Sequence, residues 1–248
     1  MTRPSASATA GLLADLAALG PYFAVDMHRP GSPPRPPWQP LDALIGSPDA
    51  LAGRIGDVRE RLAAAAGLPA TAVEFRVAAS IAQLGLCARL LSPALGAAAA
   101  GRALPVDTAQ ARWVPALGGP FRLSLPDTVL EDSAVRTSAA VDPAATAELL
   151  AGAITQIVRA VQAMAVSPRV LWGNVASAVN GAATMIAAAR PDLASPAAGA
   201  AAALLGQPVL AGTYQGRPLD GFRRRNCCLI YRLSPTAPAY CGDCVLGQ

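Results

Sequence analysis

Four of the five cysteines lie close together near the C-terminus, and their spacing restricts how that end of the chain can fold. Cys227 and Cys228 are adjacent, twelve residues follow, and Cys241 and Cys244 then form a C-x2-C motif. Twelve extended residues would span on the order of 40 Å, whereas the ligands of one metal centre lie within a few ångström of one another. If the four thiols act together, the segment between Cys228 and Cys241 must therefore double back.

The composition of that segment permits such a return. The run LIYRL is β-prone, the run SPTAPA is rich in turn residues, and Gly242 lets the backbone bend inside the C-x2-C motif. Four thiolates suit either an all-cysteine zinc site or an iron–sulfur cluster. Successive side chains of an extended segment diverge, so Cys227 and Cys228 are poorly placed to bind one tetrahedral ion. A two-iron cluster accepts this spacing more readily, while a zinc site or four reduced thiols remain open alternatives.

The rest of the chain is dominated by helical patterns, because apolar residues recur every three or four positions. The ranges predicted to be helical are a short stretch through Leu12, Leu13, Leu16 and Leu19, the segment from Pro48 to Gly67, residues 71 to 99 with a break at Pro93, residues 143 to 166, and a helix that starts at Pro168 after the N-cap residue Ser167. Leu171, Val175, Val179 and Ile186 form the apolar stripe of the last helix. Gly173, Ser177 and Gly181 form a row of small residues on it, which predicts close approach of a neighbouring segment.

Strand signals are few. In RWVPALGGPFRLSLP, two β-prone runs flank Gly118, Gly119 and Pro120, which predicts a hairpin, and Pro115 suggests that its first strand is an edge strand. Residues 28–40 form a Pro-rich loop, and the tail from about Thr213 is expected to be irregular or β-like. The predicted class is therefore α+β, with a predominantly helical body, a small antiparallel β element and a C-terminal cysteine module.

Several functions lack the residues that they need. All 20 basic residues are Arg, they are scattered apart from Arg223, Arg224 and Arg225, and the net charge is only +4, so nucleic-acid binding is not expected. Phosphate and dinucleotide loops are absent, which argues against direct use of NAD(P)H or a flavin. We expect neither a transmembrane segment nor a targeting segment, and hence a cytoplasmic protein. His28, the single His, is predicted to be a solvated loop residue, and Cys87 to be a core residue.

The segment RRRNCCLIYRL…YCGDC resembles the C-terminal signature of the FhuF-type ferric siderophore reductases, in which C-C and C-x2-C flank a spacer of about ten residues. VLWGNVASAV and RVAASIAQLGLCARLLSPAL resemble the body of that family more loosely. The spacer here has twelve residues, and the extra two fall in the Pro-containing bend, where they should enlarge the loop without moving the ligands.

The resemblance implies a [2Fe–2S] cluster on Cys227, Cys228, Cys241 and Cys244, and one-electron reduction of siderophore-bound Fe(III). Residues 1–212 would then be a siderophore-recognition body and residues 213–248 the cluster module, with a separate ferredoxin-type electron donor. We expect Cys241 and Cys244 to share one iron. One residue of the set Arg223, Arg224 and Arg225 is predicted to point inward and tune the cluster, and the others to attract a partner; a solvated basic patch is the simpler interpretation. The alternatives are a non-catalytic helical protein with a zinc staple and a general [2Fe–2S] electron carrier.

Overall fold

The computed structural model describes residues 6–131, 148–233 and 240–247. The α-helices in it are α1 (Ala6–Ala18), α2 (Leu41–Ile45), α3 (Pro48–Ala66), α4 (Phe75–Ala99), α5 (Thr128–Glu131), α7 (Thr155–Gln162), α8 (Pro168–Ala189) and α9 (Ala194–Leu205). Shorter helical turns are η1 (Ala70–Ala72), the π-helical η2 (Leu150–Ile154), η3 (Pro191–Leu193), η4 (Pro208–Leu210) and η5 (Ile230–Leu233). The strands are β1 (Asp26–His28), β2 (Gln39–Pro40), β3 (Arg112–Val114), β4 (Arg122–Pro126), β5 (Tyr214–Arg217) and β6 (Asp220–Arg224). These elements confirm the predicted α+β class with a predominantly helical body.

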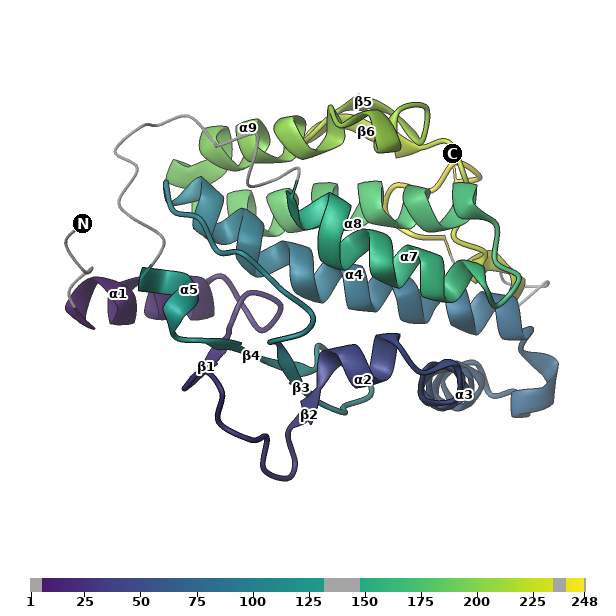
Figure 1. Ribbon diagram of the computed structural model, residues 1–248. Coiled ribbons are helices and arrows are strands. Elements are labelled where there is room, and N and C mark those ends of the chain that lie inside the picture. Colours follow the sequence, from purple (N-terminus) through teal and green to yellow (C-terminus); the bar gives the residue numbers. More distant parts are fainter. Residues whose placement is uncertain (1–5, 132–147, 234–239, 248) are drawn as a thin grey trace.

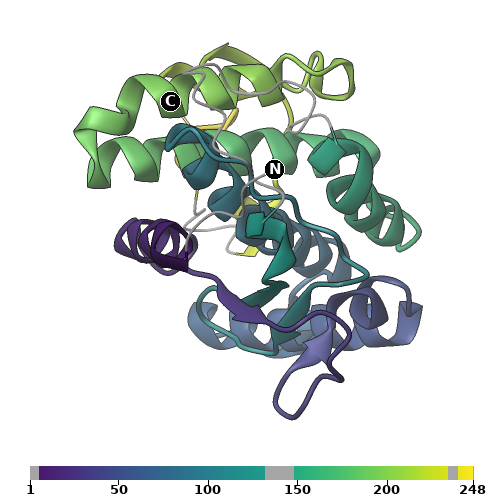
Figure 2. The same ribbon diagram turned by 60° about the vertical axis from the view of Figure 1, so that its left-hand side comes forward.

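The elements are stacked in three layers (Figure 1). Helices α4, α7 and α8 lie in the middle. The upper layer in Figure 1 contains α9 and the β5–β6 hairpin, and the lower layer contains α1, α2, α3 and the small sheet. Figure 2 shows the same order after rotation about the vertical axis. Since α4 contacts α3 below it and α8 and α9 above it, this helix connects all three layers.

The contact between α4 and α8 forms the centre of the hydrophobic core. The predicted stripe of Leu171, Val175, Val179 and Ile186 is confirmed, because each of these side chains is fully buried. Full burial of such side chains stabilises the fold by about 1.5–3 kcal/mol each. Alanines on both helices keep the two backbones close, so this pair forms a firm platform for whatever packs on its outer surface.

Helix α4 continues through Pro93, which corrects the predicted break at that residue. Pro93 has no N–H to donate to the carbonyl of Arg89 and would usually end or kink a helix. The turn around it is buried, and the hydroxyl of Ser92 donates to the carbonyl of Ala88 at 2.7 Å. Packing of this buried turn outweighs the local preference of the proline.

The small sheet has the strand order β1-β4-β3-β2. Its antiparallel β3–β4 pair, in which Arg112 lies opposite Ser124, confirms the hairpin predicted around Gly118–Pro120. Strand β1 adds to β4 in parallel, so the sheet is mixed and not wholly antiparallel. The prediction of an edge strand from Pro115 is wrong, because β3 lies between β4 and β2. Pro115 follows the last strand residue, Val114, where its missing N–H removes no ladder hydrogen bond.

The Pro-rich segment 28–40 connects β1 to β2 and is irregular between them, as predicted. Its first residue, His28, ends β1, and its last two residues form β2. The guanidinium of Arg112 donates to the carbonyl of Ser32, and to the Ser32 hydroxyl at 3.0 Å. The loop is thereby attached to the middle of the sheet.

The helix predicted over residues 143–166 is shorter at its C-terminal end. Residues 143–147 lie outside the described residues, and α7 ends at Gln162, after which Ala165 takes a left-handed φ of 62°. Helix α8 begins at Pro168 after Ser167, as predicted, although the Ser167 hydroxyl makes no cap hydrogen bond. The prediction of the helix start was correct, whereas the proposed side-chain cap was not.

Two helices, α4 and α8, are long and apolar enough to span a membrane by length and composition alone. In each, most of the apolar window is buried inside the protein, 72% for α4 and 61% for α8. Core helices of this kind meet the same criterion, so their hydropathy is explained by the packing described above.

Candidate functional site

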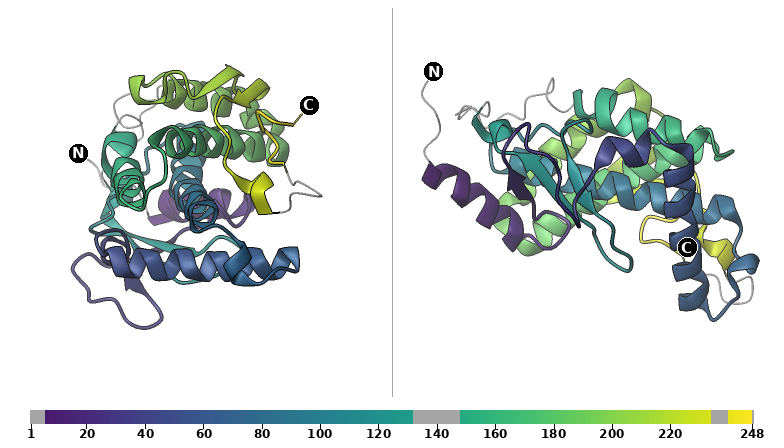
Figure 3. Two further views of the ribbon diagram at one scale, coloured as in Figure 1. Left: turned by 90° about the vertical axis from the view of Figure 1, so that its right-hand side faces the viewer. Right: turned by 60° about the horizontal axis from the view of Figure 1, so that its bottom comes forward.

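The C-terminal segment runs along the outside of the α4–α8 platform (Figure 3). The β5–β6 hairpin contacts α8, and η5 contacts α4 and α3. The ring of Phe222 is buried and stacks on Tyr214 at 5.4 Å between centroids, which anchors the hairpin. Beyond the hairpin, Arg232 forms an ion pair with Glu74 at 2.6 Å. The tail is therefore attached to the body at both of these points.

The predicted β-prone run LIYRL does not form a strand. Its last four residues form the 3-10 turn η5, which follows a left-handed residue, Leu229, with a φ of 74°. This reversal of the backbone directly after Cys228 turns the chain toward α3 and α4. An extended strand could not change direction in this way. The SPTAPA bend, residues 234–239, lies outside the described residues.

Hydrogen bonds to the core helices fix both cysteine pairs. The hydroxyl of Ser80 on α4 donates to the carbonyl of Cys228 at 2.8 Å, and the hydroxyl of Ser177 on α8 donates to the carboxylate of Asp243 at 2.5 Å. The backbone N–H of Arg224 donates to the carbonyl of Asp243 at 3.0 Å. The C-C half is thus held against α4 and the C-x2-C half against α8, and the Arg224–Asp243 bond joins the latter half to the end of β6.

Part of the row of small residues on α8, which consists of Gly173, Ser177 and Gly181, faces the C-terminal cysteine segment. A Cβ added at Gly173 would contact the guanidinium of Arg224 at 3.3 Å and the Cβ of Asn226 at 3.4 Å, and Ser177 binds Asp243. A Cβ at Gly181 would meet nothing within 4 Å. The predicted close approach is confirmed at the first two positions and is wrong at Gly181.

The fold brings together cysteines from the two halves of the motif. The sulfur atoms of Cys228 and Cys241 lie 3.7 Å apart, so the predicted return of the chain is confirmed for this pair. Cys228 and Cys244 are buried, Cys227 and Cys241 are partly exposed, and all four thiols are free of disulfides. The four cysteines therefore lie at the boundary between core and solvent.

Backbone N–H groups point at two of the sulfurs. The N–H of Leu229 donates to the sulfur of Cys227, and the N–H of Leu246 donates to that of Cys244, each at 3.3 Å. Each donor lies two residues after its cysteine, so both halves of the motif use the same local geometry. Such donors stabilise a thiolate more than a thiol, and hydrogen bonds to sulfur are one means by which proteins adjust iron–sulfur potentials.

The thiols influence one another, and one cation acts on three of them. The hydrogen bond shared with Cys241 lowers the pKa of Cys228 to about 6, and Arg224 adds to this lowering. The same bond raises the pKa of Cys241, and Arg224 acts against that rise. Burial raises the pKa of Cys227, with like-charge effects from Cys228 and Cys244, and Arg224 again opposes it. The guanidinium of Arg224 is therefore close enough to act on three of the four cysteines.

Arg224 is the inward-pointing residue of the Arg223–Arg225 run. It is only 1% exposed, its Nε donates to the carbonyl of Asn226 at 3.0 Å, and its Nη2 donates to Oδ1 of Asn174 at 2.5 Å. Its Nη1 is buried and has no hydrogen-bond partner in the described part of the chain. A buried cation without a counter-ion is costly, so this geometry is suited to an anionic group beside it.

A buried polar network, which the sequence pattern did not predict, holds Arg224 in place. The amide nitrogen of Asn174 donates to the carbonyl of Ser80 at 2.9 Å and to the amide oxygen of Gln83 at 2.9 Å. These three residues are buried on the facing sides of α4 and α8. Their signal in the sequence was the occurrence of amides and a hydroxyl at core positions of apolar helices, where polar groups must find partners.

Arg223 and Arg225 are exposed, as the simpler interpretation predicts. The Nη1 of Arg223 donates to the carbonyl of Gly247 at 2.8 Å, so its side chain lies along the last described residues. The Arg225 side chain has no polar partner among the residues that the structure describes. The three arginines therefore separate into one buried and two exposed residues.

Cys87 and His28 do not contribute to this site. Cys87 is fully buried in α4, burial raises its pKa strongly, and the amide of Gln83 donates to its sulfur at 3.1 Å, as expected for a core residue. His28 is not a solvated loop residue as predicted. It is half-buried at the end of β1, with Nδ1 2.8 Å from the hydroxyl of Ser124, and burial lowers its pKa.

Within residues 6–131, 148–233 and 240–247, no three His, Cys, Asp or Glu side chains are arranged to hold a metal ion. The assignment of four ligands remains a prediction. What the structure contributes is a donor set of four free thiols, two sulfur-directed N–H groups and a buried guanidinium with an unused donor, and this set fits an anionic thiolate centre. Comparison with protein-family models finds no matching family, and comparison with curated proteins finds no relative.

Proposed function

We propose that this protein is a cytoplasmic [2Fe–2S] oxidoreductase that reduces siderophore-bound Fe(III) to Fe(II) by one-electron transfer. Cys227, Cys228, Cys241 and Cys244 would hold the cluster, which supplies one-electron chemistry when bound. The observation that carries the proposal is the position of Arg224. Its buried guanidinium, with an unpartnered Nη1, acts on three of the four cysteines of the motif.

The proposed centre would carry a negative charge, which is complementary to the buried guanidinium of Arg224 and the nearby N–H groups. Four thiolates outweigh the positive charge of a two-iron, two-sulfide core, so the centre is anionic and becomes more so on reduction. Arg224 would balance that charge, and the N–H groups of Leu229 and Leu246 would stabilise the thiolates of Cys227 and Cys244. The partly exposed cysteines, Cys227 and Cys241, lie on the side from which an electron donor could approach.

Reduction of one siderophore-bound Fe(III) to Fe(II) requires one electron. A separate donor of the ferredoxin type supplies it, since the chain has no recognisable dinucleotide loop. Fe(III) is a hard ion that oxygen ligands hold tightly, and Fe(II) binds the same ligands less well. Reduction therefore loosens the iron from its chelator, and no group of the protein needs to displace the chelator.

The direct test is electron paramagnetic resonance of the anaerobically purified, dithionite-reduced protein. We expect a reddish-brown protein with a [2Fe–2S] signal on reduction, and reduction of a ferric siderophore once a ferredoxin system is added. NADPH alone should leave the Fe(III) unreduced. A colourless protein that contains stoichiometric zinc would exclude the proposed function.

Substitution of the cysteines assigns the ligands. Each of Cys227→Ser, Cys228→Ser, Cys241→Ser and Cys244→Ser should lose most of its iron and sulfide, because each removes one thiolate from the centre. Cys87→Ser is the matched control and should keep the cluster, provided that it folds. Full iron and sulfide content in any of the four tail variants would contradict the assignment.

A structural zinc site is the second candidate, and the same observation supports it. A four-thiolate zinc centre is also anionic and would also balance Arg224. The adjacent Cys227 and Cys228 favour the wider two-iron centre. Metal analysis together with colour distinguishes the two, and saturable binding of a ferric siderophore distinguishes a reductase from a general electron carrier.

A further inference from the structure

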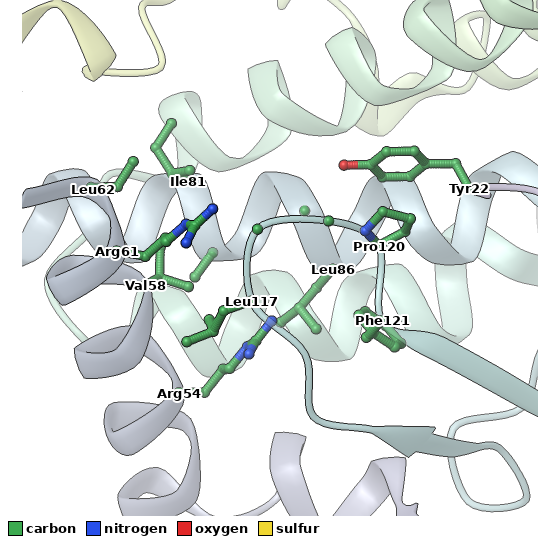
Figure 4. Close-up of a pocket in the computed structure, with 14 residues that line it drawn as sticks. Tyr22, Arg54, Val58, Arg61, Leu62, Ile81, Leu86, Leu117, Pro120 and Phe121 are labelled. Atoms are coloured by element: carbon green, nitrogen blue, oxygen red, sulfur yellow. The ribbon is translucent and has the colours of Figure 1, made fainter. Parts of the chain in front are cut away.

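A pocket lies on the opposite side of α4 from the Asn174 network, between α3, α4 and the loop that joins β3 to β4 (Figure 4). Its volume is about 180 Å³. Its floor is apolar and is formed by Leu86 of α4, Val58 of α3 and Leu117 of the loop. An engineered apolar cavity of about 150 Å³ holds benzene, so this space is large enough for one substituted six-membered ring. It is too small for a complete siderophore, since pockets for drug-sized ligands start near 300 Å³.

Two guanidinium groups of α3 border this apolar floor. Figure 4 shows Arg54 and Arg61 extending from the helix toward the loop at Leu117. Arg54 donates to the carbonyl of Ala116 at 2.7 Å and lies over the Trp113 ring, and burial lowers its pKa. Neither arginine forms an ion pair with a carboxylate of the described chain. The carboxylate of Asp57 acts on Arg54 without forming a direct ion pair. The pocket therefore combines an apolar interior with two guanidinium groups that have no directly bonded carboxylate.

Arg61 is held at the pocket by a glycine and not by a hydrogen bond. A Cβ added at Gly118 would lie 2.6 Å from Nη2 of Arg61, and Gly118 has a φ of 82°. The guanidinium thus packs directly on the loop backbone, which only glycine permits here. Its donors have no partner in the described ranges and remain available to a ligand. Across the pocket, the hydroxyl of Tyr22 points toward the α3 side and is likewise without a partner among those residues (Figure 4).

We propose that this pocket binds an aryl oxyanion: a single aromatic ring on the floor of Leu86 and Leu117, with its negative oxygens at Arg61 and Arg54. On the proposed function, this group is a catecholate arm of an anionic ferric siderophore. The ring-sized apolar space selects the ring, and the two guanidiniums select its charge.

The position of the pocket suits electron transfer to that substrate. Ile81 lines the pocket, and its neighbour on α4, Ser80, donates to the carbonyl of Cys228. The two residues are consecutive, so a single helix about 10 Å thick separates the ring-binding space from the cysteine segment. An iron held at the mouth of the pocket would be separated from the cysteine segment by about one helix diameter, and it would not need to enter the protein.

Binding is measured by isothermal titration with gallium(III) tris-catecholate, which has the charge of the ferric complex but is not reduced. The neutral gallium(III) tris-hydroxamate is the comparison chelate, and free catechol tests whether the ring alone suffices. We expect the tris-catecholate to bind at least tenfold more tightly than the tris-hydroxamate, and catechol to bind weakly at the same site. Equal affinity for the two gallium complexes would overturn the proposal.

Gly85 offers a way to fill the pocket without damage to the core. It lines the pocket on α4, and a Cβ added there meets nothing within 4 Å. Gly85→Leu should abolish tris-catecholate binding. The midpoint temperature of thermal unfolding should stay unchanged or rise slightly, since glycine is a poor helix former. The control is Gly181→Leu on α8, where a Cβ also meets nothing within 4 Å. Wild-type binding by Gly85→Leu would exclude the pocket as the site.

The charge requirement is tested by Arg61→Gln, which should weaken tris-catecholate binding about tenfold and leave the weak hydroxamate binding unchanged. Arg169→Gln is the matched control, because Arg169 is an exposed arginine at the start of α8, outside the pocket. Equal losses in both variants would mean that only the net charge matters, which contradicts a defined site.

The same measurements separate this proposal from the proposed function. Binding of the gallium complex should survive in Cys228→Ser, which is expected to lack the cluster. If that variant binds but wild-type protein shows no [2Fe–2S] signal, the pocket stands and the proposed function fails. If wild-type protein shows the signal and reduces Fe(III) while Gly85→Leu does so at an unchanged rate, the pocket assignment fails alone.

Discussion

Two buried arginines, Arg89 and Arg224, lie in different regions of the molecule and differ in their hydrogen-bond partners. Arg89 is 2% exposed and donates to three carbonyls: those of Phe121 at 2.7 Å, Tyr22 at 2.9 Å and Ala24. Arg224 is equally buried, yet one of its terminal nitrogens has no partner. The first guanidinium connects α4 to β4 and to the chain after α1, whereas the second lies beside the cysteines.

The difference separates a guanidinium whose nitrogens all have partners from one with a nitrogen that could still donate to a ligand. Each of the three guanidinium nitrogens of Arg89 donates to a backbone carbonyl, so none of them is left without a partner. Arg224 is held by Asn226 and Asn174 but keeps one donor free, next to thiols that become anionic on binding a metal. Burial lowers the pKa of Arg89 to about 10, so that residue is charged at neutral pH. The contrast concerns the hydrogen-bond partners of the two arginines.

The largest expected effect is on stability and comes from Arg89→Met. This change leaves the carbonyls of Tyr22, Ala24 and Phe121 without their donor, and an unsatisfied buried group costs about 1–3 kcal/mol. We expect the free energy of unfolding, measured by urea denaturation of the cluster-free protein, to fall by about 3–5 kcal/mol. A loss below about 1 kcal/mol would show that Arg89 is not the structural residue of this comparison.

Arg224→Met is expected to have a smaller effect on stability and a distinct effect on the cluster. In cluster-free protein, relief of the buried charge offsets the two lost hydrogen bonds, so the loss should be less than half of that for Arg89→Met. In the loaded protein, removal of a positive charge disfavours the more negative reduced state. The midpoint potential should therefore fall by on the order of 100 mV, if the charge acts from about 6 Å at an effective dielectric constant near 20.

The measurement is a spectroscopic redox titration of wild type, Arg224→Met and the exposed control Arg223→Gln. Solvent screens the charge of Arg223, so its replacement should change the potential little. Equal shifts in both variants would remove the distinction between inward and outward arginines. A normal potential in Arg224→Met would leave Arg224 with a packing role only.

The sequence was sufficient to predict the helical body because its signals are local. The stripe of Leu171, Val175, Val179 and Ile186 is a repeat along one helix, and burial of that stripe is what the helix gains by packing. The hairpin around Gly118–Pro120 is equally local. Pro93 misled the prediction because buried tertiary contacts, which a local pattern does not contain, decided the outcome.

The candidate site was predictable only in part. The cysteine spacing required the chain to return, and the sulfurs of Cys228 and Cys241 do meet. The partners that surround them come from positions far apart in the sequence. Ser80, Asn174 and Arg224 are joined by hydrogen bonds across 50 to 94 residues, and each belongs to a different element. The sequence left two interpretations of the arginine run open, a solvated basic patch or one inward arginine, and only these contacts identify Arg224 as buried.

The smallest expected effect concerns Arg225, the exposed cation nearest to the cysteine end of the hairpin. Its backbone N–H pairs with the carbonyl of Thr213 at the open end of β5–β6, while Arg217 lies at the turn end. Four residues at about 3.3 Å each place the two positions about 13 Å apart along the hairpin. Screening acts over about 8 Å at 0.15 M ionic strength, so only Arg225 should influence an acidic donor that approaches the cysteines.

Arg225→Gln should therefore slow second-order reduction of the cluster by a ferredoxin-type donor about two- to threefold at low salt, with no change in potential. Steering of this kind affects encounter and fades as ions screen the charge, so the difference from wild type should vanish at about 0.5 M salt. Arg217→Gln is the control with the same charge change at the opposite end of the same hairpin, and it should match wild type throughout. Stopped-flow rates over a series of salt concentrations decide the matter. If Arg217→Gln slows reduction as much as Arg225→Gln does, the donor responds to net charge alone, and the basic run before the cysteines has no directional role.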